Sequence, residues 1–251
     1  MAEPVVPTDV NAASFDSAHD DVFSRIAARY DFLCDLFSLC IHRRWKSRMA
    51  RRILAAPWKQ MLDVAAGTGH ISLRVVRQLG AKDGRSCIVS DICPAMLDVA
   101  KRRAGTLADA VDFRILDAHR LTPIASASID LYSISLGMKI CDRAQALAAA
   151  WRVLRPGGMF ICLEASEIPV RFIHRAYLAY MRLCMPIVGW AATGGDASAY
   201  EYLLKGVRGF PGAQEFADEM AALGFVDVAY ERMSLGIVAI HVARKPESAR
   251  A

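Results

Sequence analysis

Met61-Leu62-Asp63-Val64-Ala65-Ala66-Gly67-Thr68-Gly69-His70 decides the fold: it is an apolar run that ends in a loop of small residues. A helical pattern follows, and a second apolar run then ends at Asp91. This order predicts the β-α-β unit of nucleotide-binding sheets. Gly67 and Gly69 let the backbone come close to a ligand where a Cβ would obstruct it. A lone Gly-x-Gly also fits an ordinary tight turn, and the surrounding residues distinguish the two interpretations.

Three residues around the loop favour S-adenosylmethionine as the ligand. Asp63 places a negative charge on the first strand, which suits a cationic amino acid better than a pyrophosphate. Ser72 stands where the dinucleotide fingerprint has its third glycine. Asp91, about 20 residues beyond the loop, is placed to accept hydrogen bonds from a ribose diol. We therefore expect S-adenosylmethionine, and not NAD, at this site.

Strand-like and helix-like runs alternate along most of the chain. Strand character marks 62–65, 86–91, 111–116, 129–135, 159–164, 226–230 and 236–243. Helical spacing of apolar residues marks 22–30, 32–40, 70–79, 94–104, 143–154 and 213–223. The breakers at 155–158 are typical of a turn. The alternation predicts an α/β fold with a doubly wound, mostly parallel seven-stranded sheet, which ends in a hairpin with an antiparallel edge strand.

The segment 171–210 interrupts this alternation. The run 177–192 is too short to cross a membrane and contains Arg182. We expect an inserted helical cap over the cofactor end of the sheet, at 171–210. The segment is apolar and rich in aromatic residues and methionine: Tyr177, Tyr180, Met181, Met185, Trp190, Tyr200, Tyr202 and Phe210.

Composition predicts one folded domain in a reducing compartment. The 251 residues are 54% apolar and 23% charged, which allows a substantial core. We expect a flexible tail at 1–21 and a loosely held end after Lys245. No secretory signal is recognisable. The seven cysteines are scattered without a C-x-x-C pair, which argues against a disulfide framework and a zinc site. We therefore expect a cytoplasmic protein without a bound metal.

Positive charge is concentrated at 41–52. The net charge of +5 is too mild to imply nucleic acid, but this segment carries six Lys and Arg residues. Trp45, Met49 and Ile53 recur at helical spacing, so the helix either lies on an anionic membrane surface or presents a solvated basic face. No aromatic platform for stacking bases accompanies the charge, and we expect no nucleic-acid partner.

Four strand ends each supply a predicted cofactor contact. The glycine loop offers backbone donors near the amino-acid end of the cofactor, and Asp91 takes the ribose. Asp117 and Ala118 follow the third strand, where a carboxylate and a backbone amide can bind the adenine amino group. Ser135 ends the fourth strand, where the methionine moiety is expected. The predicted cofactor-binding residues are Asp63, Ala65, Gly67, Thr68, Gly69, Asp91, Ile92, Met96, Asp117, Ala118 and Ser135.

The chain also resembles the ubiquinone/menaquinone biosynthesis C-methyltransferases, a family of class I S-adenosylmethionine-dependent methyltransferases, over roughly 22–241. The most specific matches flank the cofactor core. On the amino-terminal side they are Tyr30-Asp31 and Ser38-x-x-Ile41-His42-Arg43-x-Trp45-Lys46, and on the carboxy-terminal side Asp196-Ala197-Ser198-x-Tyr200-x-Tyr202-Leu203 and Gly236-Ile237-Val238-Ala239-Ile240-His241. The resemblance implies a methyltransferase domain at 22–245, with the segment 171–210 over the substrate.

This resemblance implies methyl transfer to a ring carbon of a prenylated quinol. Such a reaction needs a phenol that loses its proton, and the enzyme contributes orientation and electrostatics. The family has Arg-Asn where this chain has Lys139-Ile140, so the charge is kept and the planar fork is lost. Lys139 is a candidate to stabilise the phenolate, and a solvated lysine is the alternative. Tyr30, in the Tyr-Asp motif, is a candidate to touch both substrates, and a helix-packing tyrosine is its alternative.

Other acids and histidines are weaker candidates. Glu164 ends the fifth strand and is expected to support other residues, while His70, His174 and His241 are expected to be structural. Two further functions stay open: a methyltransferase of the same fold that acts on another hydrophobic acceptor, such as an aromatic metabolite or a lipid headgroup, and a non-catalytic cofactor-binding scaffold. The apolar segment 171–210 and the basic segment 41–52 allow peripheral membrane contact, and the sequence decides neither this contact nor a homodimer.

Overall fold

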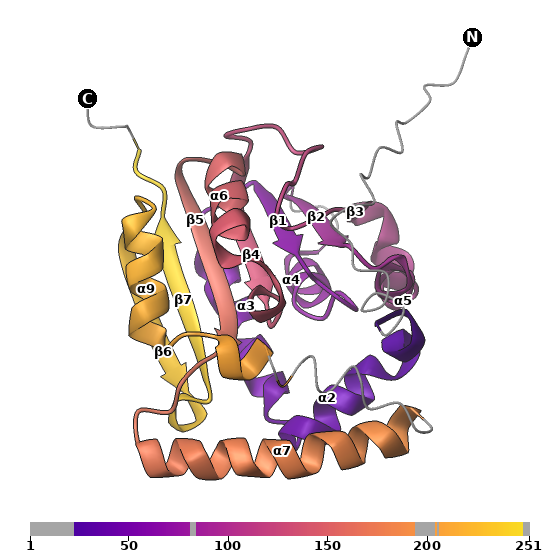
Figure 1. Cartoon of the computed structure of the whole chain (residues 1–251). Helices are drawn as coiled ribbons and strands as arrows, with labels where there is room; N and C mark the ends of the chain where they lie inside the picture. Colours follow the sequence, from indigo (N-terminus) through magenta and orange to yellow (C-terminus); the bar gives the residue numbers. More distant parts are fainter. Residues whose placement is uncertain (1–22, 81–83, 194–203, 205, 248–251) are drawn as a thin grey trace.

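A seven-stranded sheet organises the computed structural model, which describes residues 23–80, 84–193, 204 and 206–247 (Figure 1). The strands lie in the order β3-β2-β1-β4-β5-β7-β6. All pairs from β3 to β5 are parallel, and β7 runs antiparallel to both β5 and β6, so the predicted hairpin closes the edge. The strands are β1 (Gln60–Val64), β2 (Ser86–Asp91), β3 (Asp112–Ile115), β4 (Ile129–Ser135), β5 (Leu154–Ala165), β6 (Val226–Met233) and β7 (Val238–Arg244).

Helices cover both faces of the sheet, as the doubly wound prediction requires. Apolar residues of α3 and α4 pack on one face, and those of α6 and α9 pack on the other. Successive residues of a central strand point to opposite faces, so Leu131 belongs to the first layer and Tyr132 to the second. The helices are α2 (Tyr30–Ser38), α3 (His42–Ala55), α4 (Ser72–Leu79), α5 (Pro94–Ala104), α6 (Arg143–Val153), α7 (Arg171–Thr193) and α9 (Ala213–Ala222).

The order of the strands fixes where a ligand binds. The chain winds outward in one direction from β1 and in the other from β4, so these neighbours mark the point where the topology switches. In open α/β sheets, ligands bind beyond the carboxyl ends of the strands at this point. The short helix η3 (Met138–Ile140) follows β4 there.

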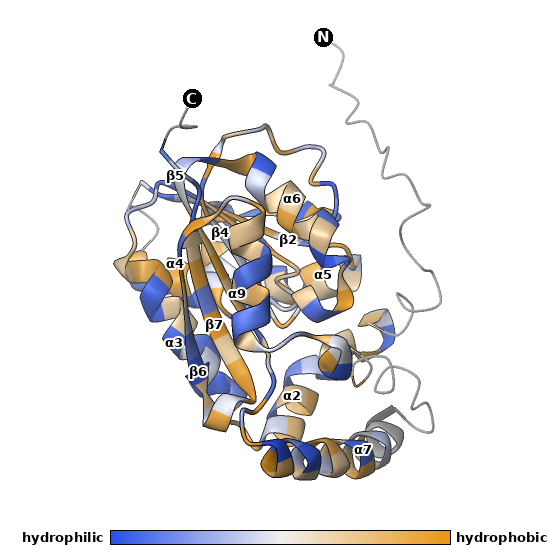
Figure 2. Ribbon diagram, turned by 60° about the vertical axis from the view of Figure 1, so that its left-hand side comes forward, coloured by the Kyte–Doolittle hydropathy of each residue, from blue (hydrophilic) through white to orange (hydrophobic). Residues whose placement is uncertain are grey.

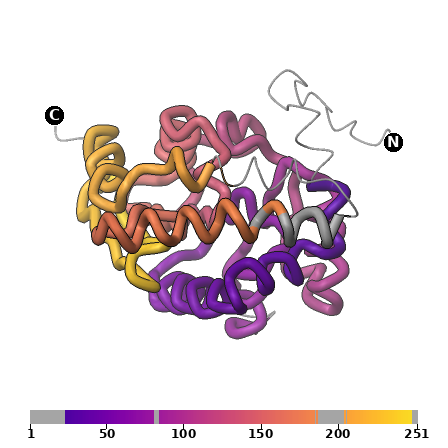
Figure 3. Tube along the Cα trace, turned by 60° about the horizontal axis from the view of Figure 1, so that its bottom comes forward, coloured from indigo at the N-terminus to yellow at the C-terminus, as the bar shows by residue number. Residues whose placement is uncertain are grey.

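Two helices cover this end of the sheet. Both α2 and α7 lie beyond the strand ends, and the end-on view shows α7 crossing the molecule with α2 beside it (Figure 3). Leu33 of α2, Met181 of α7 and Met96 of α5 share one apolar cluster. The predicted cap therefore begins with a long helix. Tyr200, Tyr202 and the signature at 196–203 lie outside the described residues.

The structure of the basic helix α3 does not fit the interpretation in which its apolar side lies on a membrane. Trp45, Met49 and Ile53 of α3 are buried against the sheet, so the apolar face of this helix belongs to the core. An apolar face that packs on the sheet is not free to enter a bilayer. The helix presents a solvated basic face instead. Across the described residues, no helix is long and apolar enough to span a membrane.

The turn predicted at 155–158 is instead part of β5. This strand begins at Leu154, directly after α6. Gly157 N–H donates to the carbonyl of Lys245 at 2.9 Å, and the carbonyl of Gly158 accepts from Lys245 N–H at 2.9 Å. The residue that follows β7 thus supplies a pairing partner that lies far away in sequence. The helix predicted at 22–30 is likewise interrupted, by the 3-10 turn η1 (Ala27–Arg29).

Candidate active site

The glycine loop after β1 is tightly wound. Ala65, Gly67 and Gly69 all have positive φ, at 49°, 56° and 69°. A Cβ on Gly69 would lie 3.1 Å from the Cβ of Ala100, so this glycine lets α5 pack against the loop. A Cβ on Gly67 would have only the ring of Tyr30 nearby, 3.9 Å away at Cε1. Gly67 thus keeps one side of the loop open, and Tyr30 lies over that side.

Asp91 is held at the end of β2 by the loop that it faces. Its Oδ2 accepts from Gly67 N–H at 2.7 Å, and its Oδ1 accepts from Cys93 N–H at 2.9 Å. Burial raises the pKa of Asp91, and these backbone hydrogen bonds counter the shift. Each carboxylate oxygen retains acceptor capacity, which a ribose diol can use. Of the two predicted neighbours, Ile92 is half-buried and Met96 is buried in the apolar cluster with Cys93.

Asp63 lies beneath the loop. Ser133 of β4 donates to its Oδ1 at 2.5 Å, and Ser90 of β2 donates to its backbone carbonyl at 3.0 Å. Burial raises the pKa of Asp63 to about 6. The carboxylate of Asp63 thus joins β1 to β4, and its backbone carbonyl joins β1 to β2. The charge of this carboxylate lies below the glycine loop.

The strand end after β4 meets the loop after β1. A Cβ on Gly137 would lie 2.6 Å from the Cβ of Ala65, so only glycine fits there. The hydroxyl of Ser135 is buried at this junction, and it has no hydrogen-bond partner within the described part of the chain. A buried hydroxyl without a partner is costly, and a ligand group can supply one. This orphaned atom lies where the methionine moiety of the cofactor is expected.

Asp117 has a partner that the sequence did not suggest. His119 Nδ1 lies 2.9 Å from Asp117 Oδ1, and the N–H of Asp142 donates to His119 Nε2 at 2.9 Å. Because Nε2 accepts a hydrogen bond, the proton of the neutral ring is on Nδ1 and points to Asp117. His119 thus orients the carboxylate predicted to bind adenine. The side chain of Ala118 packs in the core, so only its backbone is free for a ligand.

A polar network ties α2 to the glycine loop. Thr68 Oγ1 donates to Asp31 Oδ1 at 2.8 Å, and Arg103 donates to both Thr68 O and Thr68 Oγ1 at 3.0 Å. Arg103 also forms an ion pair with Asp31. The side chain of Thr68 is therefore directed at α2. This network holds the neighbouring Tyr30 over Gly67.

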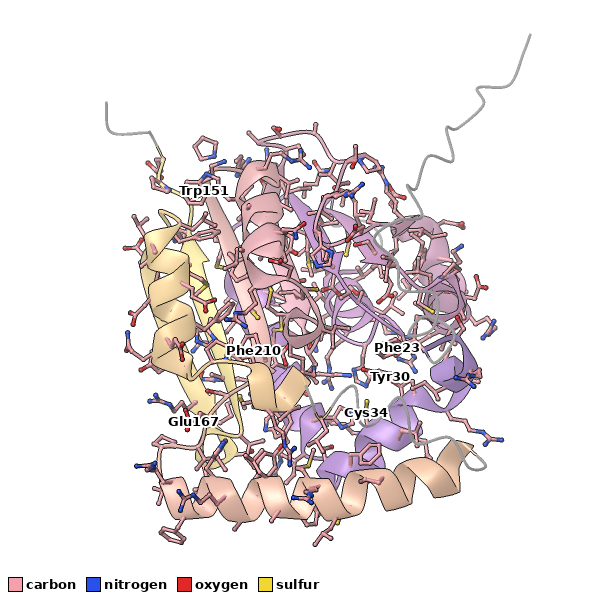
Figure 4. The ribbon with its side chains drawn as sticks, viewed as in Figure 1. Phe23, Tyr30, Cys34, Trp151, Glu167 and Phe210 are labelled. Atoms are coloured by element: carbon pink, nitrogen blue, oxygen red, sulfur yellow. The ribbon has the colours of Figure 1, made fainter. Side chains whose placement is uncertain are left out.

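An apolar cavity of about 300 Å³ lies on the other side of Tyr30. Its walls come mainly from α2, α3, α7, the segment after β4 and the turn between β6 and β7, with Ala165 at the end of β5. Tyr30 and Cys34 project from α2 beside the strand ends (Figure 4). Cys34 and burial together raise the pKa of Tyr30 well above its usual range, so its hydroxyl is protonated at neutral pH. Tyr30 thus lies between the glycine loop and the cavity, and it also packs against the apolar cluster of α2, α5 and α7.

Lys139 lines this cavity and is ion-paired. Its Nζ lies 3.2 Å from Glu164 Oε1, and its backbone N–H donates to Glu164 Oε2 at 3.1 Å. Ala165 N–H donates to the same carboxylate at 2.7 Å. Both side chains are buried, so Lys139 is not a solvated lysine. Glu164 supports it, as expected, and balances its charge.

Lys46 is a second buried amine that the sequence analysis missed. Its side chain is 7% exposed, and burial lowers its pKa while Cys34, Asp35 and Asp63 oppose the shift. The residue lies on the stripe of α3 that also carries Met49 and Ile53. That helical spacing was visible in the sequence and could have identified Lys46 as buried.

The histidines have structural positions. His42 is buried beside the cavity, where Ser38 Oγ lies 2.8 Å from its Nδ1, and burial lowers its pKa to about 4. His241 Nε2 lies 2.8 Å from the carbonyl of Ala213, which fits the packing role expected of it. His174 Nδ1 accepts from Ile168 N–H at 3.2 Å at the start of α7. Burial also lowers the pKa of His70 to about 4.

Two solved structures that share this fold are named as methyltransferases. An O-methyltransferase family protein from Burkholderia thailandensis superposes with a TM-score of 0.63 at 15% identity and covers 94% of this chain and 62% of that one. The CurJ carbon methyltransferase superposes with a TM-score of 0.59 at 15% identity, over 94% of this chain and 57% of that one. Identities this low establish the fold alone.

Relatives found by sequence share more of their residues with this chain than these solved structures do. The ubiquinone/menaquinone biosynthesis C-methyltransferase UbiE of Cereibacter sphaeroides is 39% identical over 223 residues, which are 88% of this chain and 87% of that protein. The UbiE protein of a Bradyrhizobium species is 39% identical over 240 residues, 93% of each chain. The sequence profile of the ubiE/COQ5 methyltransferase family matches residues 11–245. This chain therefore belongs to the ubiE/COQ5 methyltransferase family.

Proposed function

We propose that this chain is an S-adenosylmethionine-dependent C-methyltransferase that acts on a ring carbon of a prenylated quinol in ubiquinone- or menaquinone-type biosynthesis. One observation carries the proposal: Tyr30 lies over the open side of Gly67 and also lines the apolar cavity. A methyl donor at the loop and an apolar acceptor in the cavity would therefore meet at this residue. The relatives named UbiE supply the class of acceptor.

The residues of the loop fit S-adenosylmethionine. Asp91 is oriented for the ribose, Asp117 for the adenine, and the orphaned hydroxyl of Ser135 for the methionine moiety. Asp63 supplies negative charge below the site of a cationic cofactor. When bound, the cofactor supplies an electrophilic methyl group on a sulfonium centre.

The cavity fits an apolar molecule with a polar head. Its walls are mainly aliphatic and aromatic, and Lys139 places an ammonium group among them. In carbon methylation, the ring carbon attacks with electron density released by the phenolate, and the ring then loses its proton to recover aromaticity. A buried cation stabilises the phenolate in a site of low dielectric. Lys139 is thus the proposed electrostatic residue, positioned by Glu164, and Tyr30 is the proposed orienting residue.

A second candidate follows from the Lys139-Ile140 departure. A lysine is a point charge without the planar fork of arginine, and here it already shares that charge with Glu164. A methyltransferase of this fold that acts on another hydrophobic acceptor, such as a lipid headgroup or an aromatic metabolite, would need less precise charge placement. For either acceptor we propose a cytoplasmic protein with peripheral membrane contact.

Labelled S-adenosylmethionine and membrane extracts separate these functions. The protein is incubated with both, and the labelled lipid is identified by mass spectrometry. Label on a prenylated quinol supports the proposal, and label on a headgroup supports the second candidate. The variant Asp91→Ala is the negative control: it should keep the fold, lose cofactor binding and label no lipid. Cofactor binding without label in any extract would leave a scaffold as the remaining function.

A further inference from the structure

The outer face of α7 is apolar and uncovered. Phe172, Ala176, Ala179 and Leu183 recur at helical spacing on one side of this helix and are all exposed, Phe172 to 74% and Leu183 to 67%. The inner side of the same helix carries Met181, which is buried against α2. An exposed stripe of this kind is not needed to hold the helix in place, because the inner side already packs.

Other exposed apolar side chains lie at the same end of the molecule. Phe32, Leu36 and Leu39 form an exposed stripe along α2, and Leu39 is 71% exposed. Leu235, in the turn η4 (Ser234–Gly236) after β6, is also exposed. That turn touches the residues before α7, since a Cβ on Gly236 would lie 2.9 Å from Pro169. The apolar stripes of α7 and α2 with Leu235 are called the docking face below. The cavity proposed for the acceptor lies between the helices that form it.

The charge on this face is positive. Arg171, Arg175 and Arg182 are exposed beside the apolar stripe of α7, and the helix contains neither aspartate nor glutamate. Within the described ranges, none of the three has an acidic partner. Figure 2 shows hydrophobic and hydrophilic residues side by side along α7. An apolar stripe flanked by arginine is typical of a helix that lies in the interface of an anionic membrane.

A second copy of the chain fits this face less well. A twofold contact would bring the same surface of each copy together, and the arginines of α7 would then face one another. Like charges at an interface oppose association, whereas anionic headgroups complement them. Exposed Arg44, in the first turn of α3 directly after α2, adds positive charge beside the apolar stripe of α2.

We propose that the docking face binds the surface of an anionic lipid bilayer and that α7 lies in the interface. This proposal rests on the proposed function in one respect: a prenylated acceptor would pass from the bilayer into the cavity. It narrows the membrane contact that the sequence suggested for the segment 171–210 and the basic helix. The apolar side of α3 is buried, so the apolar part of the contact falls to α7 and α2.

Vesicle sedimentation with the full chain tests the docking face. We expect binding to phosphatidylcholine vesicles that contain phosphatidylglycerol, weaker binding to phosphatidylcholine alone, and loss of binding at high salt. Phe172→Ser with Leu183→Ser should weaken binding about 100-fold. Arg175→Gln with Arg182→Gln should weaken it about 25-fold, since each arginine contributes about fivefold. Unchanged vesicle binding in both double variants would overturn the proposal.

Matched controls lie elsewhere on the surface. Val226→Ser removes a side chain that is 43% exposed at the start of β6, the end of the sheet away from α7 (Figure 1), and Arg102→Gln removes an exposed arginine of α5. Neither should change vesicle binding. A dimer that Leu183→Ser dissociates in sedimentation velocity would give the face to a second copy and contradict the proposal.

Turnover separates this proposal from the proposed function. With a prenylated quinol supplied in detergent micelles, the docking variants should retain normal turnover, because none of the substituted residues lines the cavity. Vesicle binding without methyl transfer to the quinol would support the docking face and contradict the proposed function. Methyl transfer in micelles, without vesicle binding by the unmodified chain, would support the proposed function and contradict the docking face.

Discussion

The proposed cofactor half and the proposed acceptor half of this site are built in different ways. The cofactor half consists of strand ends and the loops directly after them, so each predicted residue reaches the site through local sequence: Gly67 through its own turn and Asp91 through its own strand. The acceptor half is a cavity between α2, α3, α7 and the loop after β4, which are far apart in the chain. Motifs therefore identify the first half, and only tertiary structure defines the second.

The largest effect is expected in the cofactor half, when its acid is removed. Asp91→Ala removes the predicted ribose contacts and leaves Gly67 N–H without its partner. Hydrogen bonds to a charged group are worth about 1.5–3 kcal/mol each, so cofactor affinity should fall about 1,000-fold. Calorimetric titration measures this change. Asp98→Ala, an exposed acid of α5, is the matched control, and equal affinities in both variants would remove Asp91 from the site.

The acceptor half should fail in turnover and not in cofactor binding. Lys139→Met alone would leave Glu164 buried without its partner, at a cost of about 3–5 kcal/mol in the free energy of unfolding. The double variant Lys139→Met with Glu164→Gln avoids that charge. We expect its kcat to fall about 100-fold, with cofactor affinity nearly unchanged. Lys139→Arg should keep most of the activity, and full activity of the double variant would exclude an electrostatic role.

The two halves should respond to acid with opposite sign. His42, beside the cavity, has a pKa of about 4, below its unfolded value of 6.5, so the unfolded chain binds more protons between these values. Its stability contribution is present above pH 6.5 and is lost as the pH falls. Asp63, below the loop, has a pKa of about 6, above its unfolded value of 3.8. Its unfavourable charge is relieved as the pH falls below 6.

Urea unfolding at pH 7 and pH 5 measures this difference. The loss of stability over this interval should shrink by about 2 kcal/mol in His42→Gln and grow by about 1 kcal/mol in Asp63→Asn. Changes of the same sign in both variants would refute a lowered pKa for His42 together with a raised pKa for Asp63.

The smallest effect is expected from His119. Its ring orients Asp117 and does not itself end a strand, so His119→Ala removes one supporting hydrogen bond. Cofactor affinity should fall about fivefold, or about 1 kcal/mol. His119→Asn should recover part of that loss, because its amide can still donate to Asp117. Unchanged cofactor affinity in both variants would show that Asp117 does not need the hydrogen bond from His119.

Local patterns predicted much of the fold correctly. The bounds of β2, α5 and β4 match the expected 86–91, 94–104 and 129–135, because apolar runs and a proline at the first helical turn mark them. The turn expected at 155–158 is wrong because its backbone pairs with Lys245, directly after the distant strand β7. Local breakers carry no information about such a partner.

Within the candidate site, too, local sequence predicted some residues and missed others. Gly67, Asp91 and Ser135 follow from their places at strand ends, whereas the ion pair between Lys139 and Glu164 does not. These two residues belong to neighbouring strand ends, and the sequence does not show that their side chains meet. His119 was overlooked for the same reason, since its second partner is the backbone of Asp142.

The position of the transferred methyl group tests the central claim most directly. Turnover with S-adenosylmethionine that carries a ¹³C methyl group, followed by ¹³C NMR of the product, shows which atom receives it. The meeting of the cofactor loop and an apolar cavity at Tyr30 predicts a methyl group bonded to a ring carbon of a prenylated quinol. A methyl group on oxygen or nitrogen, or on a molecule without a quinol ring, would contradict it.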